Sequence, residues 1–280
     1  MITLVELMDL VPRGADRFEG HSPDDGWRRI FGGLAFSQAL MAAYGTIEGK
    51  VCHSAHGYFL RAGIPSLPVD YAVDRVRDGA GFSARRVEAS QGGKPIFMLM
   101  ASFQAPEPGP EHQYAMPDET PPEELQDEIQ RWRDLGDALP EGARRVAFGN
   151  NRIEVRRPGP PLATLDTPQP PRRVIWMRAA EPLPDDPRLH QAALAYASDF
   201  TFLSTALAVH GYGFWSLCLQ TASLDHALWL HRPTDFNEWH LFVQEAPSTG
   251  AGRGFVHGRM FRRDGVLVAS MAQEGLIRPK

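Results

Sequence analysis

The sequence predicts an α+β protein made of two similar halves, each with an antiparallel sheet wrapped around a long buried helix. In each half, a run of small and apolar residues precedes a series of short strands. Gly-Ala-Gly occurs at 79–81 and at 250–252, each time followed by a phenylalanine, a strand, a glycine turn and another strand. Ala101-Ser102 is echoed by Ala269-Ser270. This shared order indicates an internal duplication. Two such units, joined as one continuous antiparallel sheet, form a hot-dog fold in duplicate.

The length of 280 residues allows one large domain or two of ordinary size. We expect an N-terminal hot-dog domain at residues 1–115, a connector at 116–148 and a C-terminal hot-dog domain at 149–280. The composition, 43% hydrophobic and 22% charged, is typical of a globular protein. A net charge of −5, with interspersed signs and no long basic run, argues against a nucleic-acid partner.

The first half contains the predicted elements in the order strand, helix and four strands. The segment MITLVELMDLVPRG predicts a short amphipathic helix ended by Pro12 and Gly14, and its acidic residues argue against a signal peptide. Residues 15–31 predict a strand and a loop, and the Ala-rich run after Gly32-Gly33 predicts a helix packed on a sheet. The four strands, the last two joined by a hairpin at Gln91-Gly-Gly, are expected at 53–61, 68–77, 82–90 and 94–104.

Residues 105–170 differ in character because proline and glutamate are frequent there, which is typical of a connector. Within it, 123–135 predicts one polar helix and 151–155 a short strand. The second half then repeats the first. Strands are expected at 173–180, 219–231 and 238–245, and 254–261 and 266–273 form a closing hairpin. A buried helix over Leu189–Leu207 follows the first of these strands.

Asp199 is the only charged residue between Gln191 and Val209. A helix that is hydrophobic all round is buried, and an unpaired carboxylate is costly there. Asp199 is therefore either fully hydrogen-bonded for structural reasons, or its desolvation raises the pKa of the carboxyl and makes a better base.

Two further polar residues stand in apolar strands of the second half. Gln273 ends a strand on the face that carries Ala269 and Met271, so it points toward Asp199 if that face meets the helix. Otherwise it is a surface residue at a strand end. Ser223 lies in the strand 219–231, where a hydroxyl satisfied within the sheet is the alternative. Asp225 and His226 are adjacent and so point to opposite faces, which argues against a cooperating acid–base pair.

Several kinds of active site are disfavoured because their motifs are absent. The chain has no G-x-S-x-G, no phosphate-binding G-x-x-x-x-G-K-[ST], no dinucleotide-binding G-x-G-x-x-G and no H-E-x-x-H. His53 and His56 lack a suggested third ligand, so we expect no metal. Cys52 and Cys218 are far apart, which argues against a disulfide framework, a structural zinc and a cysteine nucleophile. No run reaches the roughly 18 apolar residues of a membrane span, so we expect no membrane association and a cytoplasmic location.

Segments across both halves resemble the bacterial acyl-CoA thioesterase II family, which has peroxisomal relatives in eukaryotes. They are FGGLAFSQAL (31–40), HSAHGYFLRAG (53–63), RDGAGFSARRVEASQGGKPIFMLMASFQAPE (77–107), YASD (196–199), ASLDHALWLHRP (222–233) and RGFVHGRMFRRDGVLVASMAQEGLIR (253–278). They occur in the order of the family and leave mainly the connector unmatched.

The resemblance implies a double hot-dog fold and hydrolysis of fatty acyl-CoA, of medium to long chain, to free fatty acid and CoA without a cofactor. It implies three catalytic residues: Asp199 as the general base, with Ser223 and Gln273 holding the attacking water. Ser223 stands where some relatives carry threonine, and it keeps the hydroxyl but loses the methyl that restrains χ1. The family also implies a homodimer or homotetramer.

Further residues are candidates for binding the substrate. Backbone N–H groups at the Gly32-Gly33 helix start could hold the oxyanion. Arg61, Arg85 and Arg86 could contact the CoA phosphates, or they are simply solvated. The acyl chain needs an apolar tunnel, for which Phe36, Tyr58 and Phe59 are candidates, with plain core residues as the alternative.

Two other functions stay open. An enoyl-CoA hydratase of the same fold would need an Asp–His pair at the active helix, and the sequence suggests no histidine beside Asp199. A non-catalytic acyl-CoA-binding or sensor module would bind without turnover.

Overall fold

The computed structural model describes residues 2–23, 29–139, 141–147, 149, 151–164, 166–213, 216 and 218–280. Its helices are α1 (Leu4–Met8), α2 (Gly32–Tyr44), α3 (Glu128–Asp134), α4 (Glu141–Ala147), α5 (Pro187–Ser198) and α6 (Phe202–Ala208). Short 3-10 turns occur at Pro122–Glu124, Gly136–Ala138 and Leu162–Thr164. None of the helices in this described part of the chain combines the length and apolar character that crossing a membrane requires.

The described strands form one continuous antiparallel sheet in the order β1-β2-β4-β5-β6-β3-β10-β13-β12-β11-β8-β7, with β9 paired to β13. In the first half they are β1 (Val11–Pro12), β2 (Arg17–Gly20), β3 (Val51–Phe59), β4 (Val69–Asp78), β5 (Phe82–Gln91) and β6 (Lys94–Gln104). In the second half they are β7 (Ile153–Arg156), β8 (Arg172–Ala179), β9 (Leu219–Ser223), β10 (Asp225–Leu230), β11 (His240–Gly250), β12 (Arg253–Arg262) and β13 (Leu267–Pro279).

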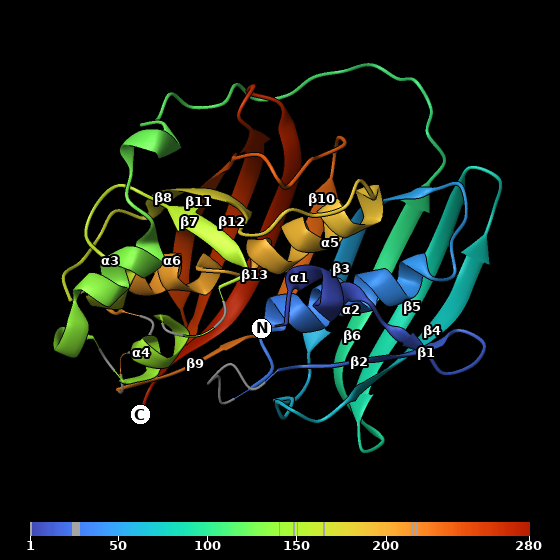
Figure 1. Ribbon diagram of the computed structural model, residues 1–280, viewed down its shortest axis with the longest axis horizontal. Helices are drawn as coiled ribbons and strands as arrows, with labels where there is room; N and C mark the ends of the chain where they lie inside the picture. Colours follow the sequence, from blue (N-terminus) through green and yellow to red (C-terminus); the bar gives the residue numbers. More distant parts are fainter. Residues whose placement is uncertain are drawn as a thin grey trace.

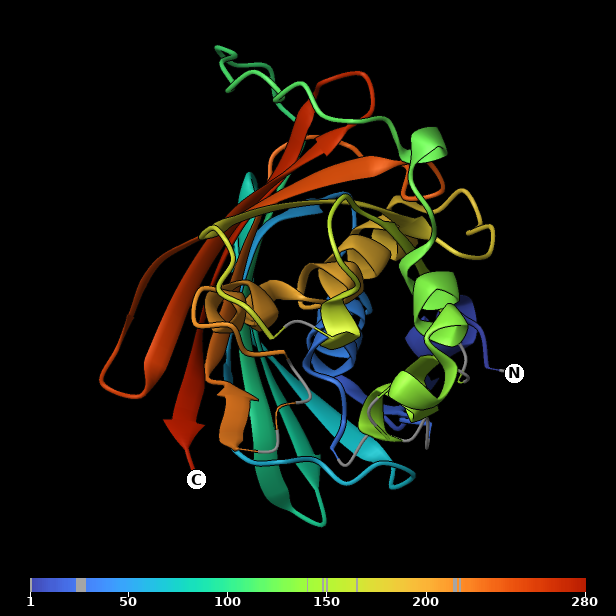
Figure 2. The same cartoon turned by 90° about the vertical axis from the view of Figure 1, so that its left-hand side faces the viewer.

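The strand order confirms the predicted duplication. From the outside inward, the first half runs β2-β4-β5-β6-β3 and the second runs β8-β11-β12-β13-β10, so corresponding strands occupy corresponding places. The halves join where β3 pairs with β10, and Tyr58 lies opposite Asp225 there. Figures 1 and 2 show the sheet curving around α2, α5 and α6, which lie together on its concave side. The predicted α+β double hot-dog fold, one sheet with a helix in each half, is therefore confirmed.

Helix α2 is buried along almost its whole length because small residues let it approach both the sheet and α5. Ala39, Ala42 and Ala43 are inaccessible to solvent. Where α2 ends, the Tyr44 hydroxyl accepts a hydrogen bond from the Cys52 amide (2.8 Å) and also bonds Gln191 of α5. The helices of the two halves thus pack on each other as well as on the sheet.

The predicted single helix over Leu189–Leu207 is wrong in one respect, because it is divided at Asp199. Helix α5 ends at Ser198 with Asp199 as its C-cap, and α6 begins after Thr201. Thr201 has a φ of 77°, in the left-handed region that a helix interior does not allow. Its hydroxyl accepts a hydrogen bond of 3.0 Å from the Gln244 amide of β11, which holds the break in place.

The predicted single strand at 219–231 is also divided. Strands β9 and β10 pair with β13 in registers that differ by one residue, so Leu224 is a bulge. The Leu224 amide donates to the Glu274 carbonyl (2.9 Å), and the Glu274 amide donates to the Asp225 carboxylate (2.6 Å) in place of a backbone acceptor. A one-residue shift exchanges the faces of a strand. Ser223 and His226, three residues apart, therefore both face the helices.

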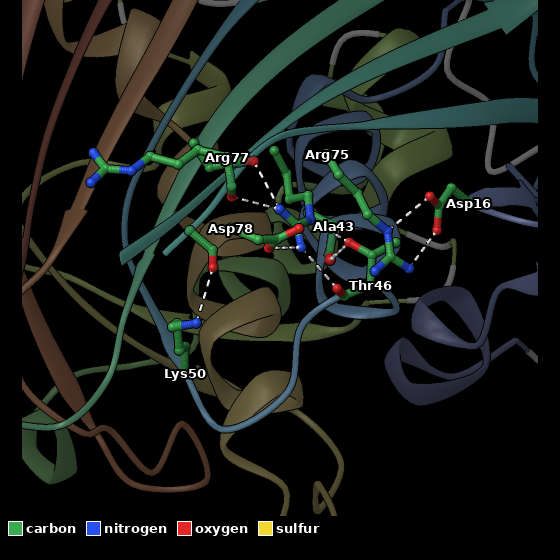
Figure 3. Close-up of polar contacts among 10 residues, drawn as sticks. Asp16, Ala43, Thr46, Lys50, Arg75, Arg77 and Asp78 are labelled. Atoms are coloured by element: carbon green, nitrogen blue, oxygen red, sulfur yellow. Dashed lines mark hydrogen bonds and ion pairs between the residues drawn. The ribbon is translucent and has the colours of Figure 1, made fainter. Parts of the chain in front are cut away.

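Arg85 joins the end of α2 to the sheet from a fully buried position. Figure 3 labels three residues that it bonds, Thr46, Arg77 and Asp78. The Arg85 guanidinium donates to the Thr46 hydroxyl (2.7 Å), the Thr46 carbonyl (3.0 Å) and the Asp78 carboxylate (2.6 Å). The Arg77 and Ala84 carbonyls accept the remaining hydrogen bonds, both at 3.0 Å. Every donor of the guanidinium is used within the protein.

We expect Arg85→Met to lower the free energy of unfolding by roughly 3 kcal/mol, because buried acceptors lose their donors. Arg86→Met is the matched control. Arg86 is the next residue on β5, exposed and paired with exposed Asp74, so its loss should change stability by less than about 0.5 kcal/mol. Urea unfolding of both variants measures the difference, and equal effects would contradict the structural role of Arg85.

Candidate active site

Asp199, Ser223 and Gln273 meet at one point, from three separate elements. Asp199 stands at the break between α5 and α6, Ser223 at the end of β9 and Gln273 on β13. The Gln273 Nε2 donates to Asp199 Oδ1 and to Ser223 Oγ, at 2.7 Å each. The three residues expected from the sequence are therefore one hydrogen-bonded group, and Gln273 is its centre.

The first half of the chain contributes a backbone donor to this group. The Gly33 amide, in the first turn of α2, donates to Asp199 Oδ2 at 2.9 Å. Amides in the first turn of a helix have no partner within the helix, so they are free to bind a carboxylate. A side chain at Gly32 would not fit, because its Cβ would lie 2.6 Å from Asp199 Oδ2. The site lies at the junction of the two halves and needs both.

Burial governs the electrostatics of Asp199. The surrounding protein desolvates the carboxylate and raises its pKa to about 6, although hydrogen bonds from Gln273, Gly33 and Ser223 oppose the rise. The residue as a whole is only partly buried. Asp199 is thus a partly buried residue whose carboxylate is more basic than that of an ordinary aspartate.

Aromatic rings lie near this group on the α2 side. The ring of Phe31 packs edge-on against Tyr196, with centroids 4.9 Å apart, and against Phe200 at 6.1 Å. Phe59 adjoins Gly32, since a Cβ there would lie 3.0 Å from its ring. Of the predicted tunnel residues, Phe59 borders the site, Phe36 is fully buried behind it, and Tyr58 is exposed on the opposite face of the sheet.

The arginines expected to bind CoA phosphates have hydrogen-bond partners outside the Asp199 group. Arg85 is buried in its own hydrogen-bond cluster, and that placement leaves it no free donor for a phosphate. Arg61 is exposed and donates to the Pro95 carbonyl (2.7 Å), and Arg86 is exposed beside Asp74. A phosphate contact of Arg61 or Arg86 stays a prediction.

Two residues near the site were missed in the sequence. Arg29 donates to the Thr221 carbonyl (2.8 Å), two residues before Ser223, and lines a small cavity with Phe31 and Tyr196. His226 is buried beside Gln273, and its Nε2 is 2.8 Å from the Ser198 hydroxyl. Along an unbroken strand, alternation would place His226 on the face opposite Ser223. The bulge at Leu224 brings both side chains to one face, and nothing in the sequence indicates it.

Within the described ranges, no three side chains of histidine, cysteine, aspartate or glutamate gather closely enough to hold a metal ion. The polar side-chain groups of the site are a carboxylate, a primary amide and a hydroxyl. Together, fold and site define a double hot-dog protein with a carboxylate-centred polar group at the junction of its halves.

Comparisons with known proteins agree with this class. Residues 160–276 match the family described as "Acyl-CoA thioesterase", and residues 23–104 match the "Acyl-CoA thioesterase N-terminal domain". Human acyl-coenzyme A thioesterase 8 is 40% identical over 290 residues, covering 100% of this chain and 90% of the human protein. Acyl-CoA thioesterase 2 of Haemophilus influenzae is 38% identical, covering 99% and 96%. The crystal structure of acyl-CoA thioesterase II TesB2 from Mycobacterium marinum superposes with a TM-score of 0.81 at 38% identity, covering 99% of each chain.

The chain therefore belongs to the acyl-CoA thioesterase family, a class of thioester hydrolases. The resemblance seen in the sequence is confirmed.

The raised pKa of Asp199 makes stability depend on pH in a defined direction. The folded state binds this proton up to about pH 6, whereas an unfolded aspartate releases it near pH 4. Wild type should therefore lose roughly 2 to 3 kcal/mol of stability relative to Asp199→Asn as the pH rises from 4 to 7. Urea unfolding of both proteins across this range measures the difference between their free energies of unfolding. The contributions of the other titrating groups cancel in this difference. A constant difference would contradict the raised pKa.

Proposed function

We propose that this protein hydrolyses fatty acyl-CoA, of medium to long chain, to free fatty acid and CoA, with Asp199 as the general base for water. The observation that carries the proposal is the carboxylate of Asp199, a partly buried residue, which is desolvated to a pKa of about 6 and hydrogen-bonded by Gln273, Ser223 and Gly33. Membership in the acyl-CoA thioesterase family supports the substrate class.

The reaction needs no protein nucleophile, because a thioester carbonyl is already electrophilic. A water molecule bound to Asp199 attacks the carbonyl carbon while the carboxylate takes one of its protons. The tetrahedral intermediate then expels the CoA thiolate, which receives that proton, and the acyl group leaves as the fatty acid. Asp199 ends in its starting state, so one carboxylate serves as base and then as acid.

Gln273 and Ser223 contribute orientation. Both N–H groups of the Gln273 amide are bound, one to Asp199 and one to Ser223. Both amide hydrogens are thus engaged, so Gln273 acts through Asp199 and Ser223 in this proposal, and a direct contact of Gln273 with the water stays a prediction. Ser223 Oγ accepts from Gln273, and its own hydrogen supports the Asp199 carboxylate that holds the water. Fixing both groups before the reaction lowers its entropic cost.

The first turn of α2 supplies the oxyanion donor in this proposal. The Gly33 amide is already bound to Asp199, so the Gly32 amide, one residue earlier in the same turn, is the donor we assign. The absence of a Cβ at Gly32 leaves room for the substrate carbonyl between Asp199 and Phe59. The rings of Phe31, Phe59 and Phe200 offer the acyl chain an apolar surface, which supports a medium to long chain.

We expect Asp199→Asn to lower kcat by about 100-fold or more, because the general base is lost. In wild type, kcat/KM should fall as the pH drops below about 6, since protonated Asp199 cannot accept a proton from water. Release of CoA thiol from short, medium and long acyl-CoAs measures both, and medium and long chains should be hydrolysed fastest.

Asp74→Asn is the control, because Asp74 is an exposed partner of Arg86 and should leave kcat unchanged. Turnover that survives Asp199→Asn would exclude the proposed base. Tight acyl-CoA binding by wild type without turnover at any chain length would favour the binding-module alternative.

We also propose a homodimer or homotetramer in the cytoplasm. Tyr58, Met100 and Trp229 are exposed on the outer face of β3, β6 and β10, across the junction of the halves, and His56 packs on Trp229 there. Apolar side chains gathered in this way are typical of an interaction surface. Light scattering should give the mass of two or four chains, and Trp229→Lys should reduce it. A monomeric wild type would contradict the proposal. The free thiols of Cys52 and Cys218 suit a reducing compartment.

A further inference from the structure

The orientation of the Gln273 amide decides whether the catalytic group holds together. Its Nε2 must point toward Asp199 and Ser223, since both bonds of 2.7 Å start from that nitrogen. If the amide turned over, Oε1 would face a carboxylate oxygen, the bond to Asp199 would be lost, and Ser223 would have to donate its hydroxyl hydrogen instead of accepting one. Some contact on the far side of the amide is needed to favour one orientation.

Two buried atoms on that far side lack a partner. Among the described residues, neither Gln273 Oε1 nor His226 Nδ1 has a hydrogen bond of ordinary geometry. Gln273 and His226 are each about 1% exposed, so water does not replace the missing partner from bulk solvent. Leaving two such atoms unpaired is costly, whereas a bond between them would satisfy both.

The sheet places these two side chains side by side. Ala227 of β10 pairs with Ala272 of β13, so one step further along the antiparallel ladder His226 comes opposite Gln273. The bulge at Leu224 turns Ser223 onto this same face. Directly opposed residues have Cβ atoms about 5 Å apart, which is within reach of a histidine and a glutamine.

The imidazole of His226 is held from its other side. Its Nε2 is 2.8 Å from Ser198 Oγ, at the end of α5 next to Asp199. The rings of Phe36 and Phe202 pack edge-on against it, with centroids at 5.2 and 5.9 Å. Burial lowers the pKa of His226 to about 4, although the neighbouring Gln273 side chain opposes the fall. The ring is therefore neutral near pH 7 and carries one N–H.

We propose that His226 is a positioning residue whose Nδ1–H donates to Gln273 Oε1 and fixes the amide with its nitrogen toward Asp199 and Ser223. In this tautomer Nε2 accepts from the Ser198 hydroxyl. In the other tautomer, with the hydrogen on Nε2, Ser198 would donate to the Ala195 carbonyl, also at 2.8 Å. The lone pairs of His226 Nδ1 and Gln273 Oε1 would then face each other and repel. His226 itself does not bond Asp199, so it acts through Gln273. The inference rests on the proposed function of Gln273.

The tautomer of His226 can be measured without any assay of activity. Nitrogen-15 NMR of the labelled wild-type protein at pH 7 distinguishes a protonated Nδ1 from a protonated Nε2, and the signal missing in His226→Asn assigns the residue. A protonated Nδ1 is the expected result. A protonated Nε2 would overturn the proposal, whether or not the protein proves to be a thioesterase.

Kinetics test the consequence for Asp199. His226→Leu removes the donor, and kcat should fall roughly 10- to 100-fold with KM changed less than about threefold, since the group is misaligned but the substrate surface is intact. Gln273 also lowers the pKa of Asp199, so its release should move the acidic limb of kcat/KM to higher pH. The groups that modulate this pKa are Gln273, Gly33 and Ser223, none of them charged.

His226→Asn tests rescue, because an asparagine amide can place its Nδ2 near the position of the histidine Nδ1. It should restore kcat to within about fivefold of wild type and return the acidic limb to its place. His240→Leu is the matched control. His240, the first residue of β11, is equally buried, and burial lowers its pKa to about 4. It bonds the Thr234 hydroxyl and the Glu238 carbonyl. It should cost stability without moving the limb.

Three results would overturn the proposal. The first is unchanged kinetics in His226→Leu, and the second is an equal loss of kcat in His226→Leu and His226→Asn. The third is an acidic limb of kcat/KM that moves as far in His240→Leu as in His226→Leu. If His226→Leu does not fold, the Asn variant and the tautomer measurement still decide. If wild type does not hydrolyse acyl-CoA, the proposed function fails while the tautomer measurement stands by itself.

Discussion

The desolvated carboxylate of Asp199 is the constraint on which the site depends. A partly buried charge must be met by donors, and here they come from three directions: Gln273 on β13, the backbone of Gly33 in α2 and Ser223 on β9. The local irregularities of the fold follow from this need. The helix breaks at Asp199 so that the carboxylate stands at a helix end, and β9 shifts by one residue so that Ser223 faces it. An uninterrupted helix and strand would not place these groups in the same way.

Duplication explains how one such group can be built from two similar units. The strand orders of the halves correspond, and each half places a helix on the concave side of the sheet. The site uses the halves unequally. The first supplies a helix start with two glycines, where the backbone can approach closely, and the second supplies every side chain of the group. Corresponding elements have thus taken different roles, which a duplicated chain permits because each copy can change separately.

The sequence predicted the fold through features that are local. The hairpins, the Ala-rich helix and the repeated order of Gly-Ala-Gly, strand and turn depend on neighbours in the chain, and the structure confirms the duplicated sheet. The breaks at Asp199 and Leu224 could not be predicted, because no glycine or proline stands beside them to mark a local stop. The helix break depends on Gln244, which bonds Thr201 from 43 residues further along the chain. The strand break depends on Glu274, 50 residues after Leu224. Arg85 shows the same limit, since nothing near it in the sequence indicates that Thr46 and Asp78 enclose it.

The central pairing of β3 with β10 joins the halves within one covalent chain. Gly33 and Asp199 come from different halves, yet their encounter is intramolecular, with an effective concentration that the connecting chain sets and that dilution does not change. An equivalent site built from two separate chains would come apart as the concentration fell. The fused sheet therefore makes the integrity of this centre independent of how abundant the protein is, whatever larger assembly it forms.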